Sequence, residues 1–199
     1  MDPNAGKRTL VNKLSREELQ AKLDAETFNR TTVSFYKYVI IEHPQELRDA
    51  LFAQWSQWDC LGRIYVSREG INAQMNVPEH HWDAFDAYIH GIEYFHDVPF
   101  KLAVTDKTEG KSFLKLVVKV REQIVADGLQ PEDYDVTDVG AHLTAKDWNE
   151  AIEKHDPVVV DMRNHYESEI GHFEGAVLPE AETFREELPM VLEKLKGQE

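Results

Sequence analysis

Two neighbouring segments, GRIYVS and INAQMNV, restrict the possible folds of this chain more than any other feature of the sequence. Apolar residues stand at even positions in the first segment (64 and 66) and at odd positions in the second (71 to 77). Side chains alternate between the two faces of a sheet, so one regular strand cannot contain this shift. Arg68, Glu69 and Gly70 are therefore expected to form a turn or bulge between two strands, with Gly70 supplying a permissive backbone.

Further strands and helices are predicted on both sides of this hairpin. Segments rich in β-branched and aromatic residues predict strands at 31–41, 99–106 and 111–122. Helical spacing of apolar residues predicts helices at 43–59 and 79–92, and a short amphipathic helix at 10–26 begins with Ser15 as N-cap and Glu18 three residues later. The order β-α-β-β-α-β-β is the ferredoxin-like split βαβ pattern with one additional strand. Such a sheet carries its helices on one face and leaves the other face open.

The second part of the chain has a different pattern. After a linker rich in Gly, Pro and Asp, a helix is predicted at 143–154 with Thr144 as N-cap and Asp147 as its capping-box partner. A strand at 157–163 and a helix at about 183–196 follow, which is how an α/β domain with a parallel sheet begins. We therefore expect an α+β protein with four parts: an N-terminal helical segment (1–28), a ferredoxin-like domain (29–122), a linker (123–140) and the incomplete α/β segment (141–199).

The charge of the chain supports this division. The net charge of −15 is concentrated in the second part, because residues 1–121 hold 16 Lys and Arg against 17 Asp and Glu. An acidic protein normally binds polyanions poorly, since such binding depends on local positive potential. The nearly neutral first part can still carry a basic face.

Several classes of protein are disfavoured. The longest apolar runs are far shorter than the ~18–20 residues that span a bilayer, and the first residues contain no apolar signal-peptide core. The sole cysteine, Cys60, excludes an internal disulfide, which favours the cytoplasm. The histidines lack metal-ligand spacing, nucleotide-binding glycine motifs are absent, and we predict neither a metal site nor a cofactor. The sequence does not determine whether the chain forms oligomers.

A motif in the second part resembles the rhodanese-like domain. It consists of the strand that ends in Asp161-Met162-Arg163, then Tyr166 and Glu167, then the run GHFEGA from Gly171. The chain also contains SFYKY, REGINAQ, GKSF and KVREQIVADG. With these stretches, nearly all of it from about Leu14 resembles one branch of the rhodanese superfamily. In that branch a ferredoxin-like domain precedes the rhodanese-like domain.

The resemblance implies a function in tRNA processing. Members of this branch are tRNA uridine hydroxylases, oxidoreductases that convert the wobble uridine to 5-hydroxyuridine with molecular oxygen, and the implied partner is the tRNA anticodon loop. Their reactive group is a cysteine on a loop after the next strand, which we expect to lie beyond Glu199. Cys60 is expected to be a semi-buried hydrophobic residue. This chain is therefore interpreted as an N-terminal fragment that is inactive by itself.

The resemblance also implies roles for residues near the motif. Asp161 and Arg163 are expected to orient the active-site loop; the alternative is an ion pair at the protein surface, which contributes little to stability. His172 could transfer protons, because an imidazole side chain in general changes charge near neutral pH, but anchoring of a loop by hydrogen bonds is the favoured role.

Basic residues of the first part form a second candidate site. In KSFLKLVVKVR, the residues Lys115, Lys119 and Arg121 share one face of the expected strand. With Lys37, Arg63 and Arg68, and with Tyr36, Tyr38 and Tyr65 between them, they could form a basic sheet face for phosphates and unstacked bases. The alternative is a solvated strand face that lysines keep soluble.

Two other functions remain open. A sulfurtransferase would use the missing cysteine as a persulfide carrier. A non-catalytic binding module would be complete as it stands.

Overall fold

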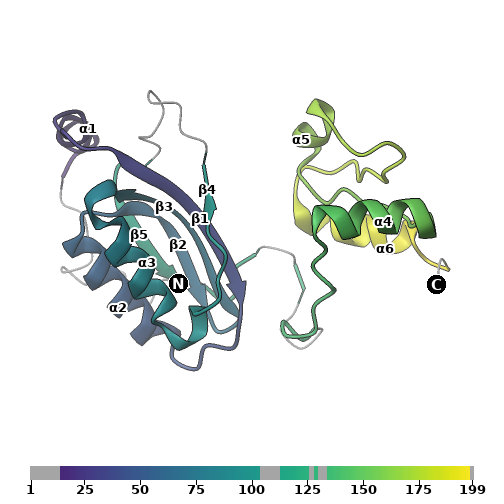
Figure 1. Cartoon of the computed structure of the whole chain (residues 1–199), viewed down its shortest axis with the longest axis horizontal. Helices are drawn as coiled ribbons and strands as arrows, with labels where there is room; N and C mark the ends of the chain where they lie inside the picture. The colour runs from purple at the N-terminus through teal and green to yellow at the C-terminus, as the bar shows by residue number, and fades with distance from the viewer. Residues whose placement is uncertain (1–13, 104–112, 126–127, 130–133, 198–199) are drawn as a thin grey trace. The chain divides into compact units, whose positions relative to one another are not determined.

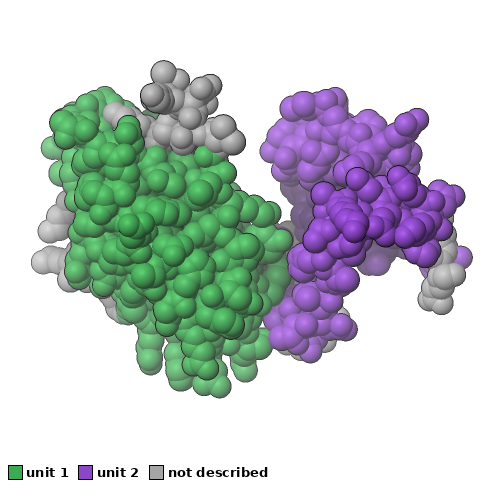
Figure 2. All heavy atoms as spheres, in the orientation of Figure 1, with its two compact units in different colours: residues 1–124 green, residues 125–199 purple. Residues whose placement is uncertain are grey.

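The computed structural model describes residues 14–103, 113–125, 128–129 and 134–197. The chain divides into two compact units, residues 1–124 and residues 125–199 (Figure 2). The finer division into four segments stays a prediction. Among the residues described, none of the helices combines the length and the apolar character that a bilayer crossing needs.

Unit 1 has the predicted element order. Helix α1 (Arg16–Asp24) comes first, and the capping box predicted between Ser15 and Glu18 is present; the predicted first turn at 10–13 lies outside the described residues. The elements that follow are β1 (Arg30–Tyr38), α2 (Pro44–Gln57), β2 (Leu61–Ser67), β3 (Gly70–Pro78), the 3-10 turn η2 (Glu79–His81), α3 (Trp82–His90), η3 (Glu93–Phe95), β4 (Lys101–Leu102) and β5 (Leu116–Val120).

The five strands form one mixed sheet in the order β4-β1-β3-β2-β5. Only the β2–β5 pair is parallel; the other neighbours are antiparallel. Helices α2 and α3 lie side by side on one face of the sheet and leave its other face without a helical layer (Figure 1). The predicted ferredoxin-like α+β fold is therefore confirmed. Strand β4 is shorter than the predicted 99–106; positions 104–106 and 111–112 of the predicted strands lie outside the described residues.

The central hairpin explains the shift in apolar positions. Arg68 and Glu69 form a two-residue turn, so that Ser67 pairs with Gly70 and Val66 with Ile71. A two-residue connection pairs an even position with an odd one, which puts both apolar sets on the same face. Gly70 belongs to β3 rather than to the turn. Its φ is +145°, and a Cβ there would lie 2.0 Å from the backbone oxygen of Lys37.

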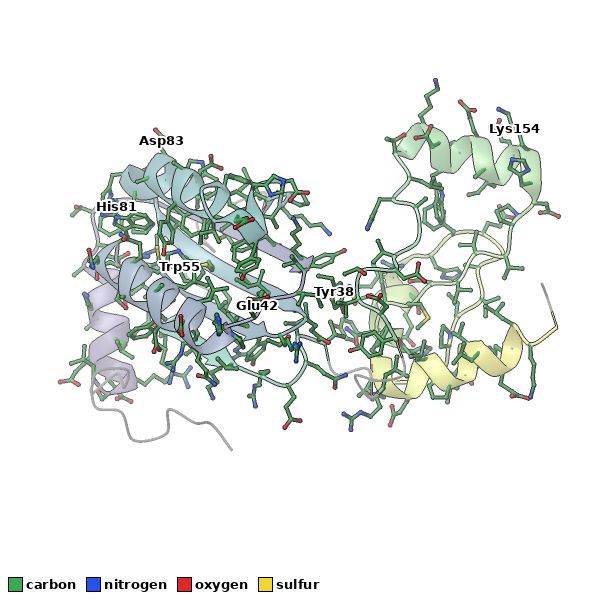
Figure 3. All side chains as sticks on the ribbon, turned by 90° about the horizontal axis from the view of Figure 1, so that it is seen from below. Tyr38, Glu42, Trp55, His81, Asp83 and Lys154 are labelled. Carbon is green, nitrogen blue, oxygen red and sulfur yellow. The ribbon has the colours of Figure 1, made fainter. Side chains whose placement is uncertain are left out.

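The core of unit 1 lies between this face and the two helices. Strand residues Ile64, Ile71 and Met75 are fully buried, as are Trp55 of α2 and Phe85 of α3 (Figure 3 labels Trp55). Burying side chains of this size stabilises a fold by roughly 1.5–3 kcal/mol each. The helical spacing of the apolar residues in α2 and α3 follows from this packing.

The described residues of unit 2 form the helices α4 (Ala145–His155), α5 (His165–Ile170) and α6 (Phe184–Lys194). Thr144 caps α4 as predicted, but the side chain of Asp147 accepts from the Thr144 hydroxyl, so the reciprocal backbone contact of a capping box is not made. Helix α5 was not predicted.

The strand predicted at 157–163 is reduced to a single parallel bridge between Val160 and Val177. Two hydrogen bonds hold it, Val177 N–H to Val159 O at 2.8 Å and Asp161 N–H to Val177 O at 3.0 Å. Within the described part of the chain, no second segment pairs with it. A strand needs a longer ladder to satisfy its backbone groups, so the expectation of a regular strand was wrong for this chain.

Candidate functional site

The face of the unit 1 sheet opposite the helices carries aromatic and polar side chains. Because Val33 and Phe35 of β1 point into the core, Ser34 and Tyr36 point to the open face. The strand register then places Tyr36 opposite Asn72, Asn72 opposite Tyr65, and Tyr65 opposite Lys119. These four residues, one from each of β1, β3, β2 and β5, form a single row across the sheet, called the tyrosine row below.

Each tyrosine of this row lies next to a cation. The Nζ of Lys101 stands 5.3 Å from the centroid of the Tyr36 ring, and the guanidinium carbon of Arg121 stands 5.3 Å from that of Tyr65. These distances are within the ~6 Å range of a cation–π interaction. The two pairs come from β4 and β1 on one side and from β5 and β2 on the other.

The open face is basic. By strand register, its residues are Arg30, Thr32, Ser34, Tyr36, Tyr38, Leu61, Arg63, Tyr65, Ser67, Gly70, Asn72, Gln74, Asn76, Pro78, Lys101, Val117 and Lys119, with Arg121 directly after β5. Of these, Arg30, Ser67 and Asn76 are buried, and Arg30 is paired with Glu26, which lies outside the sheet. No carboxylate occurs in this set of described residues. The positive charge is therefore not neutralised on the face itself, although the chain as a whole is acidic.

The predicted basic residues fall into two groups. Arg63, Lys119 and Arg121 lie on the open face, and the exposed Lys115 directly precedes β5 on the same side by alternation. Arg68 is exposed at the hairpin turn.

Lys37 lies on the opposite face. It has the same parity as Phe35 and pairs with Asp97 after η3, where it lowers the pKa of that carboxyl through a side-chain hydrogen bond. The assignment of Lys37 to the basic face was therefore wrong in placement. The sequence reasoning did not single out Lys101, because the register of the two-residue strand β4 cannot be read from apolar alternation.

In unit 2, Arg163 forms a fork-shaped ion pair with Asp161. Its Nε donates to Asp161 Oδ1 at 2.9 Å and its Nη2 to Oδ2 at 2.6 Å, and Nη2 also donates to the Gly171 carbonyl at 2.6 Å. The hydrogen bonds from Arg163 hold the pKa of Asp161 below its usual range. The pair thus ties the segment after Val160 to the loop at Gly171.

His172 has a contact that fits the loop-anchoring role. Its Nδ1 lies 2.8 Å from the Ser168 carbonyl oxygen of α5. His172, with Asp161, Arg163 and the aromatic rings of Trp148 and Phe173, lines an open depression of about 710 Å³. Its walls are largely apolar, with the ion pair and His172 as polar groups.

Glu187 of α6 is a buried group that the sequence did not reveal. The residue is 1% exposed, and its Oε1 has no hydrogen-bond partner among the described residues. Burial, and then the charge of Asp161, raise its pKa above the usual value. The signal that could have found it is the helical spacing with Val191, which places it on the inner side of α6.

Cys60 is in an environment that suppresses thiol chemistry. It is 2% exposed, and burial raises its pKa to about 12. Because the thiolate is the reactive form, this cysteine is not a nucleophile at neutral pH. No cluster of three or more His, Cys, Asp or Glu side chains able to hold a metal ion occurs among the described residues.

Comparison with known proteins gives a consistent result for both units. Residues 30–124 match the family model described as the UPF0176 acylphosphatase-like domain. The chain is 53% identical over 193 residues to a Leptospira interrogans protein named tRNA uridine(34) hydroxylase. Proteins of the same name from Yersinia enterocolitica and Photorhabdus laumondii are 46% and 43% identical over 187 residues each. These alignments cover 94–97% of this chain but only 52–53% of the relatives, so the chain spans about half their length.

Proposed function

The chain is a homologue of proteins named tRNA uridine(34) hydroxylase over nearly its whole length, and from this premise we propose that it is the tRNA-binding part of an enzyme that hydroxylates the wobble uridine of tRNA. The resemblance noted in the sequence makes 5-hydroxyuridine the product and molecular oxygen the oxidant. The anticodon loop, which contains the wobble position, is the part of tRNA that this chain contacts. We place the protein in the cytoplasm, where its substrate is found.

The open face of unit 1 supports this proposal most directly. Single-stranded RNA is bound by basic surfaces on which aromatic side chains accept unstacked bases. The tyrosine row provides two rings, and Arg63, Lys101, Lys119 and Arg121 provide the positive charge. A face kept soluble by lysines alone would not require cations placed over the rings of the exposed Tyr36 and the half-buried Tyr65.

The ion pair in unit 2 has a supporting role in the proposal. Arg163 connects Asp161 to the Gly171 carbonyl, so it fixes the loop that contains His172. We assign Asp161, Arg163 and His172 to positioning, because they hold backbone and loop rather than any reacting atom in this structure.

The reacting thiol implied by the resemblance is not provided by Cys60. Cys60 is the sole cysteine of the 199 residues, and its burial keeps it protonated. On this proposal the 199-residue chain binds tRNA without modifying it. Hydroxylation by the isolated 199-residue chain at the rate of a full-length relative would contradict this expectation.

The experiment that tests the RNA-binding role is a salt series of tRNA affinities. We compare the chain with a triple variant, K115A/K119A/R121A, between 50 and 300 mM salt. If these cations contact phosphates, the variant binds more weakly and the slope of log K against log salt is smaller by about two units.

The matched control removes three cations elsewhere, K146A/K154A/K196A. These lysines are exposed in unit 2 and change the net charge by the same amount. The control is expected to keep the slope of the unaltered chain. Equal slopes and affinities for the chain and for the K115A/K119A/R121A variant would remove the open face from the proposal.

A further inference from the structure

We infer that the tyrosine row binds two unpaired nucleotides, one base on Tyr36 and one on Tyr65, with Asn72 between them. This inference rests on the proposed function for the identity of the ligand as RNA. It goes beyond it by assigning a site of two nucleotides to particular residues and by requiring those nucleotides to be single-stranded.

The spacing of the two rings selects unpaired bases. Tyr36 and Tyr65 stand on strands that both flank β3, in the same row. Two strand spacings separate their backbones by about 10 Å. Successive bases in a helical strand are only about 3.4 Å apart. Two bases that occupy the two rings are therefore splayed out of a helical stack, which a loop permits and a duplex does not.

Each ring and its neighbouring cation form a pair about the size of one nucleotide. Tyr36 has Lys101 at 5.3 Å and Tyr65 has Arg121 at 5.3 Å. We place the base of one nucleotide on each ring, with the adjacent cation next to the phosphate of the same nucleotide. The two ring–cation pairs share this arrangement, although their cations come from opposite edges of the sheet, β4 and the end of β5.

Asn72 lies between the two ring–cation pairs. Its register partners are Tyr36 on one side and Tyr65 on the other. Among the contacts of the described residues, its side-chain amide has no protein partner. An amide offers both a donor and an acceptor, so it can hydrogen-bond to the edge of a splayed base.

The exposure of Tyr36 is the feature that a purely structural role leaves unexplained. Tyr36 is 48% exposed, on a face over which the described helices of unit 1 form no second layer. Its register neighbours on that face are polar, so the ring does not fill a core.

The test uses the full 199-residue chain and a fluorescently labelled seven-nucleotide single-stranded RNA without self-complementarity. Affinity is measured by fluorescence anisotropy for the chain and for Tyr36→Leu and Tyr65→Leu. Stacking of one base on an aromatic ring contributes ~1–3 kcal/mol, so each variant is expected to bind about tenfold more weakly. Tyr36→Phe and Tyr65→Phe keep the ring and are expected to stay within twofold of the chain.

Two controls isolate the effect. Tyr166→Leu removes an exposed tyrosine of unit 2 and leaves the affinity unchanged. A blunt-ended RNA duplex of two separate strands replaces the single strand, and its affinity is expected to be the same for the chain and the Leu variants, because paired bases do not reach the rings. Unchanged melting temperatures of the Leu variants show that the sheet is intact.

Single-strand affinities of both Leu variants within twofold of the chain would overturn the inference. The proposed function would still be tested independently by the salt series with tRNA, because that series depends on the cations and not on the tyrosines. Conversely, tyrosine-dependent binding of the heptamer without measurable tRNA binding would sustain the two-nucleotide site and refute the proposed function.

Discussion

Cys60 shows how burial decides the chemistry of a single residue. It is the sole thiol of the chain, in contact with the core between α2 and β2, and its pKa is raised to about 12 from an ordinary value near 9. At pH 8 the thiolate fraction is therefore about a thousandfold lower than that of a free thiol.

We predict that iodoacetamide alkylates Cys60 in the folded chain at least a hundredfold more slowly than in urea-unfolded chain at pH 8. The folded rate should still rise with pH up to pH 10, because the thiol is mostly protonated throughout. Mass spectrometry of quenched samples measures both rates. Folded and unfolded rates within tenfold of each other would show that the thiol is accessible and ionised.

Glu187 gives unit 2 a defined dependence on pH. Its pKa in the folded chain is raised by burial and by Asp161. A carboxyl whose folded pKa exceeds its unfolded value of about 4.5 stabilises the fold below that value. This stability is lost as the pH rises through the folded pKa.

Glu187→Gln should therefore be more stable than the chain above pH 5 and lose that advantage toward pH 4. Glu186→Gln is the matched control, since Glu186 is exposed on the same helix and its substitution removes the same charge. Amide hydrogen exchange of α6 between pH 4 and pH 7, corrected for the intrinsic rate, reports the stability of this helix. Identical pH profiles of α6 stability for the two variants would contradict a raised pKa of Glu187.

At the scale of elements, the central hairpin depends on a close backbone approach. A Cβ on Gly70 would lie 2.0 Å from the Lys37 oxygen, so β1 and β3 cannot keep their pairing with any larger residue there. The turn itself places no such demand on its two residues, Arg68 and Glu69.

We expect Gly70→Ala to lower the free energy of unfolding by about 2–4 kcal/mol, the range of strained or clashing substitutions. Gly171→Ala is the control, because a Cβ there meets nothing within 4 Å. Urea unfolding of unit 1 is followed by tryptophan fluorescence, which is dominated by the three tryptophans of that unit. A loss below 0.5 kcal/mol at Gly70 would show that the strands can separate without cost.

Elements with a strong local pattern were predictable from the sequence. Apolar spacing defined α2, and alternation with the parity shift defined β2 and β3, because their side chains pack against one core. The strand at 157–163 was not predictable in the same way. Its apolar residues are those of a buried parallel strand, but among the described residues Val177 alone pairs with it.

The candidate site was predictable in part for the same reason. Alternation in 114–121 correctly separated Lys119 and Arg121 from the buried residues of β5. It did not place Lys37, because apolar and aromatic residues stand at both parities of the segment 31–41, and only the structure shows that Lys37 shares the face of Phe35. The positions of Lys101 over the Tyr36 ring and of Arg121 over the Tyr65 ring depend on the order of the strands in the sheet. The local pattern of residues does not show this order.

At the scale of the whole molecule, charge and fold are distributed differently between the two units. Unit 1 contains 16 Lys and Arg against 18 Asp and Glu, whereas unit 2 contains 6 against 19. All members of the unit 1 core lie between Val33 and Val118, so the sheet and its open face do not depend on packing from unit 2.

We therefore predict that a chain ending at Ile124 keeps the sheet and binds the single-stranded heptamer more tightly than the 199-residue chain at 20 mM salt. The net charge of −13 on residues 125–199 repels RNA over a screening length that is about 20 Å at this salt and near 8 Å at 0.15 M. The difference should amount to several-fold at low salt and shrink toward none at 0.3 M. Circular dichroism first establishes that the shorter chain retains its sheet, and anisotropy then measures the affinities. If both chains bind equally at 20 mM salt while the Leu variants of Tyr36 and Tyr65 still weaken binding, the acidic unit does not oppose RNA, and the open face acts independently of the overall charge.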